Sequence, residues 1–310
     1  VAQNINGIAI APLSEKSSVA SLKAASEKGV KIALTDGTLE DSDFITVGYT
    51  SDQYQLGQST GEAAKKFIED ELGGEAKIAV VQFKSLLPEK SSQRVNGFLD
   101  VVEKLDGVEV VADQDAWVQD DAVSVVSDIL TANPDVNLIY AANEGGTVGA
   151  TMAVKNVGKA GSVYTFGIDA NEQLANMLLS DDNILQATTG QDSYTMGYNS
   201  MKDLISSIKG EETSIEEGTT EYVDGMLLER SDEDGINDYS IRPRWIPKTK
   251  LFSTYMWQGF ILARMGYCSP GWFAFDADRF CTKYCSQPDK MKYRKYKEMR
   301  QLYAEQGTDW

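Results

Sequence analysis

Between residues 76 and 191 the chain repeats one pattern: a short apolar strand, a loop with one polar side chain, then an amphipathic helix. Short β-branched runs that alternate with helical patterns are typical of βαβ units, whose parallel strands form a sheet covered by helices on both faces. The pattern therefore predicts an α/β fold with parallel sheets. The expected strands are residues 77–83, 108–114, 138–143, 163–169 and 184–191, and the expected helices are residues 89–105, 120–131, 145–157, 171–180 and 194–209.

The residues on either side extend the same pattern. Residues 1–74 predict strands at 5–12, 30–36 and 44–50 and helices at 15–28 and 53–72. Gly73 and Gly74 then end the second helix, as glycines after a helix usually do. After the last predicted helix, residues 220–230 indicate a closing strand or a crossover, and the acidic run 231–238 indicates a solvated surface loop.

Composition excludes several classes of function. The formal charge of −18 argues against a nucleic-acid partner, because phosphate binding requires a basic surface. The chain has no histidine, and residues 1–239 have no cysteine, so the commonest general base and metal ligands are missing. We therefore predict no catalytic residues, no metal site and no cofactor. A binding protein is the simplest interpretation.

The last 71 residues differ from the rest. Residues 240–310 hold 13 basic and 6 acidic residues, a net charge of +7, which leaves −25 for residues 1–239. This C-terminal extension also contains the three cysteines, Cys268, Cys281 and Cys285, whose spacing is a weak metal signal and equally fits packing cysteines or one disulfide. Its most apolar run, 251–265, is too short to span a bilayer. Its role stays open.

Polar side chains follow three of the predicted strands. Asn143, Asp169 and Gln191 stand at strand ends, with Arg94 and Trp117 in neighbouring loops or helix starts. Because the ligands of open parallel sheets bind beyond the carboxyl ends of the strands, we expect these five residues to form one site.

Several segments together resemble the ribose- and galactose-type periplasmic binding proteins, the type I solute receptors of sugar ABC transporters. They are INGIAIAPLSEKS, KGVKIALTDG, RVNGF, LTANPDVNLIYAANEGGTVGA, FGIDAN and ATTGQDSYTMG, in this order over about residues 1–230. The resemblance implies two Rossmann-like lobes joined by a hinge. The first lobe would hold residues 1–74 and about 192–222, and the second residues 75–191 and about 223–239. Relative to the family, a strand–helix–strand unit before residue 5 is missing, so the first lobe is expected to be truncated.

The resemblance also implies sugar-binding roles. Asp36 would accept hydroxyl hydrogens in the first lobe, and Arg94 would donate to sugar oxygens in the second. Trp117 would stack on the sugar, while Asn143, Asp169 and Gln191 would make the remaining hydroxyl contacts. Carboxylates, amides, a guanidinium and an aromatic ring do suit the hydroxyls and C–H faces of a sugar. Each residue also has a structural alternative: a turn or cap, a surface ion pair for Arg94, or a core aromatic for Trp117.

The resemblance implies an extracytoplasmic receptor, periplasmic or at the cell surface, although no signal sequence is visible in the chain. It would capture a monosaccharide, a pentose or hexose, by hinge closure and deliver it to an ABC transporter permease or a chemoreceptor. One alternative is the ligand-binding part of a lactose-repressor-like regulator, which would need a DNA-binding headpiece. Another is a carbohydrate-active enzyme, which the missing histidine and cysteine nucleophiles argue against.

Overall fold

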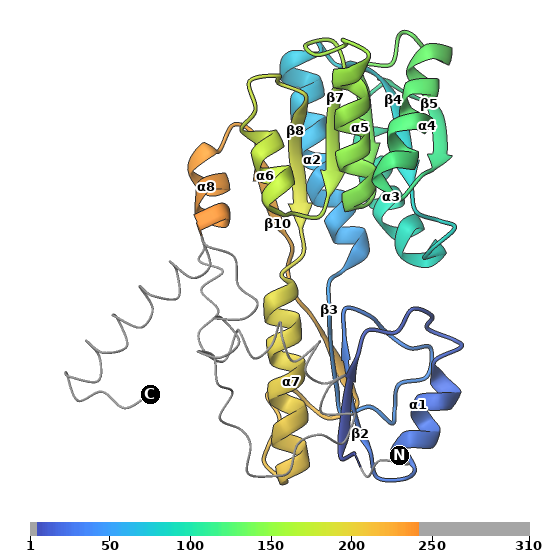
Figure 1. Ribbon diagram of the computed structural model, residues 1–310, viewed down its shortest axis with the longest axis vertical. Coiled ribbons are helices and arrows are strands. Elements are labelled where there is room, and N and C mark those ends of the chain that lie inside the picture. Colours follow the sequence, from blue (N-terminus) through green and yellow to red (C-terminus); the bar gives the residue numbers. More distant parts are fainter. Residues whose placement is uncertain (1–4, 242–310) are drawn as a thin grey trace, which may run out of the picture. The chain divides into compact units, whose positions relative to one another are not determined.

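The computed structural model describes residues 5–241, with side chains up to residue 237 (Figure 1). It forms two sheets, each with helices on both faces, as the alternation of strands and helices predicted. Among the described residues, no helix has the length and apolar character that crossing a bilayer would require. The predictions for the C-terminal extension beyond Ile241, including its three cysteines, lie outside this part of the chain.

The smaller sheet has four parallel strands in the order β1-β2-β3-β9. Side chains alternate along β2: Ile32 and Leu34 pack toward one face, and Ala33 packs toward the other. Helix α1 covers the first face and α7 the second, and together with the sheet they form the first lobe. Its elements are β1 (Gly7–Ile10), α1 (Val19–Ser26), β2 (Lys31–Thr35), β3 (Val47–Thr50), α7 (Ser193–Lys209) and β9 (Thr219–Tyr222).

The larger sheet has six strands in the order β10-β8-β7-β6-β4-β5, all parallel except β10, which is antiparallel to β8. Along β4, Ile78 and Val80 face α2 and α3, whereas Ala79 and Val81 face α4 and α5. This second lobe is formed by α2 (Gln53–Glu71), β4 (Glu75–Gln82), α3 (Pro88–Val102), β5 (Gly107–Asp115), α4 (Gln119–Ala132), β6 (Leu138–Ala141), α5 (Glu144–Asn156), β7 (Tyr164–Ile168), α6 (Glu172–Leu178), β8 (Leu185–Gly190), β10 (Met226–Glu229) and α8 (Glu233–Ile241).

Helix α2 lies with the larger sheet and not, as its position before Gly73 and Gly74 predicted, in the first lobe. Its residues Leu56, Ala64 and Ile68 belong to the same core cluster as Phe98 of α3. The two helices are in close contact: a Cβ on Gly57 would come within 2.0 Å of the Arg94 carbonyl oxygen. The chain thus crosses between the sheets before α2, at Ser51 and Asp52, rather than at the glycines that follow it.

Two further crossings join the lobes. One is at Gln191 and Asp192, between β8 and α7, and the other is at residues 223–225, between β9 and β10. Residues 220–230, predicted as a closing strand or a crossover, contain a crossover between β9 and β10, which belong to different sheets. The predicted surface loop at 231–238 is wrong, because these residues lie mostly in helix α8. Ile236 of this helix is only 1% exposed and belongs to a cluster with α6 and β10.

Candidate functional site

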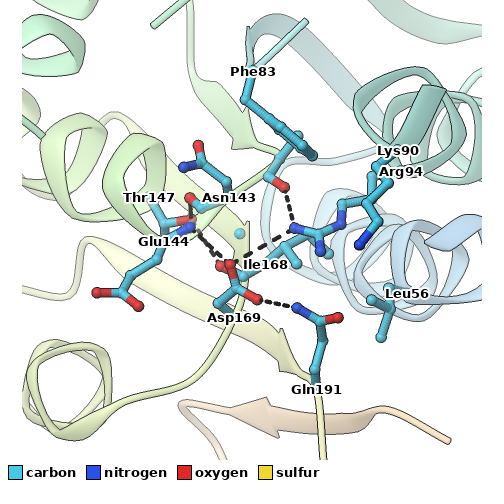
Figure 2. Close-up of polar contacts among 12 residues, drawn as sticks. Leu56, Phe83, Lys90, Arg94, Asn143, Glu144, Thr147, Ile168, Asp169 and Gln191 are labelled. Carbon is cyan, nitrogen blue, oxygen red and sulfur yellow. Dashed lines mark hydrogen bonds and ion pairs between the residues drawn. The ribbon is translucent and has the colours of Figure 1, made fainter. Parts of the chain in front are cut away.

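Three of the predicted site residues meet at one edge of the larger sheet. Strands β6, β7 and β8 are adjacent and parallel, and Asn143, Asp169 and Gln191 follow their carboxyl ends. Figure 2 shows these side chains close to Arg94, which reaches the same edge from α3. The parallel sheet thus brings together residues that are far apart in the sequence, as the strand pattern predicted.

Arg94 is held firmly at this edge. Its side chain is almost fully buried, and its Nε donates to Gln53 Oε1 at 2.8 Å. Its Nη1 donates to the carbonyl of Ala142, just beyond β6, also at 2.8 Å, and lies 3.7 Å from Asp169 Oδ2. The guanidinium stands 5.1 Å from the ring centroid of Phe83. These contacts fix the orientation of the guanidinium fork before any ligand arrives.

The backbone of α3 at Arg94 is fixed as well. Buried Tyr140 of β6 donates its hydroxyl to the Arg94 carbonyl at 3.1 Å, and its ring stacks on Phe98 with centroids 3.9 Å apart. Burial raises the pKa of the Tyr140 hydroxyl well above its ordinary range, so it remains a donor at any physiological pH.

Asp169 is the centre of the network. Its Oδ2 accepts from the backbone N–H of Glu144 at 3.0 Å, and its Oδ1 accepts from Gln191 Nε2 at 2.8 Å (Figure 2). Its backbone has φ of 75°, in the left-handed region that costs a residue other than glycine about 1–3 kcal/mol. Such a conformation persists only where the surroundings require it, and here it directs the carboxylate toward Arg94 and Gln191.

Gln191 leaves one polar atom unused. Its amide nitrogen is engaged by Asp169, but its Oε1 is buried and has no hydrogen-bond partner among the described residues. A buried acceptor without a partner costs about 1–3 kcal/mol. This atom lies at a crossing between the lobes and beside the Arg94–Asp169 pair.

Asn143 and Trp117 are placed differently. The Asn143 side chain caps α5, accepting from the N–H of Gly146 at 3.2 Å, and donates to the Trp117 carbonyl at 2.9 Å. Trp117 is 39% exposed, and only its backbone is linked to the network by these contacts. The structure thus places both residues near the edge, while the Asn143 side chain already has a capping role.

Asp36 comes from the other lobe. It follows β2, and its backbone also lies in the left-handed region, with φ of 52°. Lys90 of α3 reaches across to it: Nζ donates to the Asp36 carbonyl at 2.7 Å and lies 3.3 Å from Oδ1. The predicted first-lobe residue therefore contacts the second lobe next to the other site residues.

Three residues of this edge are absent from the sequence prediction: Gln53, Phe83 and Lys90. A signal for Lys90 exists, because it stands four residues before Arg94 and positions i and i+4 share a helix face. The signal for Phe83 is that it ends the predicted strand 77–83. Gln53 gave no signal, since only the crossing before α2 brings it to Arg94.

A family model described as a periplasmic binding protein domain matches residues 1–212. The chain belongs to this family. The predicted family is therefore confirmed. Its members are transport receptors and not enzymes, in agreement with the predicted lack of enzymatic function. A transcription regulator is not favoured.

Several relatives are 26–28% identical to the chain over the aligned residues. The ABC transporter periplasmic-binding protein YphF of Escherichia coli K12 is 28% identical over 201 residues, which are 64% of this chain and 61% of YphF. The D-allose-binding periplasmic protein of the same organism is 28% identical over 211 residues, 67% of each chain. The ribose import binding protein of Bacillus subtilis is 26% identical over 200 residues. The chain thus spans 61–67% of the length of these relatives.

Solved structures show the same fold. A periplasmic solute-binding protein from Actinobacillus succinogenes with bound D-allose superposes with a TM-score of 0.67, covering 75% of this chain and 80% of that one at 22% identity. A solute-binding protein from Bacillus halodurans with bound myo-inositol gives the same TM-score and identity. These similarities confirm the predicted α/β fold of periplasmic binding proteins.

Proposed function

We propose that the chain binds a monosaccharide, a pentose or hexose, between its two lobes and delivers it for import by an ABC transporter. The observation that carries this proposal is the network of Arg94, Asp169 and Gln191, in which polar atoms are held in place but retain bonding capacity. Relatives named for D-allose and ribose support the class of ligand.

The unused atoms match the hydroxyls of a sugar. Buried Gln191 Oε1 can accept a hydrogen from a hydroxyl. The Nη2 group of Arg94 takes no part in its two hydrogen bonds and can donate to a ring or hydroxyl oxygen. Asp36 supplies a carboxylate from the first lobe. A sugar that bridges the lobes would stabilise the state in which both contact it, since only that state offers all the partners.

Asn143 and Trp117 have supporting roles in this proposal. The Asn143 side chain already caps α5, so it would contact the sugar only through the hydrogen-bonding capacity that the cap leaves free. Trp117, partly exposed, would cover an apolar C–H face of the ring. A membrane permease or a chemoreceptor would then recognise the sugar-bound protein outside the cytoplasm.

Arg94→Lys tests the site by isothermal titration with the best monosaccharide. Lysine keeps the charge but lacks the planar fork that holds Gln53 and Ala142, so we expect affinity to fall about tenfold or more. The matched control is Arg230→Lys, because Arg230 follows β10 and bonds to carbonyls at the opposite end of the sheet. Equal affinity of the Arg94 variant and the wild type would remove Arg94 from the site.

A further inference from the structure

The contact between Lys90 and Asp36 joins the two lobes directly. Lys90 belongs to α3, which packs on the larger sheet, and Asp36 follows β2 of the smaller one. The lysine side chain is only 17% exposed and the aspartate side chain 44%. Two acceptors of the same residue, the carbonyl oxygen and Oδ1, engage one ammonium group. A surface lysine in a chance ion pair would be far more exposed.

The Asp36 backbone is shaped for this contact. Its N–H donates to the Tyr49 carbonyl of β3 at 2.9 Å, and its left-handed conformation turns the chain sharply before Gly37. There is no room for a side chain at residue 37, because a Cβ would lie 2.9 Å from the Pro12 ring. The turn is thus fixed by packing inside the first lobe, and it holds the Asp36 carbonyl where Lys90 can reach it.

The charges around the proposed sugar site are balanced in two pairs. Lys90 and Arg94 lie on one face of α3, and each has its own carboxylate: Asp36 across the lobes and Asp169 in the same lobe. Two cations one helical turn apart repel each other unless anions lie beside them. The two pairs together add no net charge to the site, which suits a neutral ligand.

We propose that Lys90 is a positioning residue of the sugar site that bridges the lobes through Asp36; this inference rests on the proposed function. The ammonium holds the Asp36 carboxylate in place while its other oxygen, Oδ2, accepts a sugar hydroxyl. The pair adds a contact between the lobes that exists only when they face each other. It therefore favours the sugar-bound state.

Lys90→Met tests this role, because methionine retains the apolar stem and removes the charge. The matched control is Lys155→Met, since Lys155 pairs with Asp182 at 3.0 Å inside the second lobe. We expect Lys90→Met to weaken monosaccharide binding about fivefold and Lys155→Met to leave it unchanged. Unchanged or tighter binding by Lys90→Met would overturn the proposal; tighter binding would mean that the lysine competes with the sugar.

Salt dependence separates this role from a merely structural one. A neutral monosaccharide has no charge for ions to screen, so a salt effect on its affinity must come from charges of the protein. We expect wild-type affinity to fall between 20 mM and about 500 mM NaCl and the affinity of Lys90→Met to change less. In Asp36→Asn, adding Lys90→Met should have little further effect. Additive losses, or equal salt dependence in both proteins, would contradict the bridge.

A sugar-free measurement keeps this inference separate from the proposed function. Acetic anhydride labels unprotonated, accessible lysines, and mass spectrometry gives the rate at each site. We expect Lys90 to react severalfold more slowly in the wild type than in Asp36→Asn, with Lys155 unchanged. Equal rates at Lys90 would overturn the pair even if sugars bind. If no monosaccharide binds but Lys90 is protected, the proposed function fails while the contact between the lobes stands.

Discussion

The close contact between α2 and α3 gives the sharpest prediction about stability. A Cβ on Gly97 of α3 would lie 2.1 Å from the carbonyl oxygen of Tyr54 in α2, and the reciprocal contact at Gly57 involves the Arg94 carbonyl. Ordinary contacts of this kind are about 3.5 Å, so Gly97→Ala must push the two helices apart by roughly 1 Å. Neither atom can rotate away, because the Tyr54 oxygen belongs to the backbone and Cβ is bonded directly to Cα.

The magnitude follows from two opposing effects. Alanine in a helix interior gains ~1 kcal/mol over glycine, whereas overpacking a core costs ~3 kcal/mol where the backbone must move. Gly97→Ala should therefore lower the free energy of unfolding by ~2 kcal/mol. In a unit of this size that corresponds to a fall in melting temperature of about 4–8 °C. The displacement of α3 should also weaken sugar binding, since Arg94 moves with it.

Gly197→Ala is the matched control. Gly197 lies inside α7, and its Cβ would have no atom within 4 Å. The helix propensity of alanine then acts alone, and stability should rise by about 0.5–1 kcal/mol. Urea denaturation followed by far-UV circular dichroism compares both variants with the wild type. If Gly97→Ala is as stable as Gly197→Ala, the close packing of α2 against α3 is wrong.

Two more predictions concern other parts of the fold. Tyr49 is buried and donates to Asp203 Oδ2 at 2.7 Å, so Tyr49→Phe should cost about 1–3 kcal/mol in urea denaturation. Burial, and then Asp203, raise the pKa of Tyr49 above its ordinary value of 10; its contribution is therefore complete below about pH 10 and is lost as the pH rises further. Wild-type stability should decrease more steeply above that pH than the stability of Tyr49→Phe, and parallel curves would refute this. Ile236→Ala should cost about 2 kcal/mol because the side chain is 1% exposed; a change below a few tenths would mean that α8 is not packed as described.

Much of the fold could be predicted because its signals are local. Apolar runs and helical periodicity depend on nearby residues, and they gave the elements between residues 5 and 209 in order. Local patterns do not show which sheet a helix or strand packs against. The apolar face of α2 fits either sheet, and only the crossing at Ser51 and Asp52 decides which one it covers. For the same reason, the sequence of residues 220–230 left a closing strand and a crossover both open, and the structure shows that β9 and β10 belong to different sheets.

The site was predictable to the extent that parallel strand ends share an edge. This rule grouped Asn143, Asp169 and Gln191 with Arg94 and Trp117 of neighbouring segments, and the resemblance added Asp36. It could not show that the Asn143 side chain caps α5, because a cap and a ligand contact use the same residue type in the same place. It also missed Lys90, whose partner is in the other lobe. Contacts between lobes depend on geometry that no local pattern encodes.

A thermal-shift titration of the 310-residue chain against a panel of pentoses and hexoses tests the central claim most directly. A ligand that binds only the folded state raises the melting temperature through mass action, by an amount that grows with its concentration. We predict a concentration-dependent rise with at least one monosaccharide, and a smaller rise in Arg94→Lys at the same sugar concentration. A cooperative transition that no sugar shifts would contradict the proposal that this chain is a monosaccharide receptor.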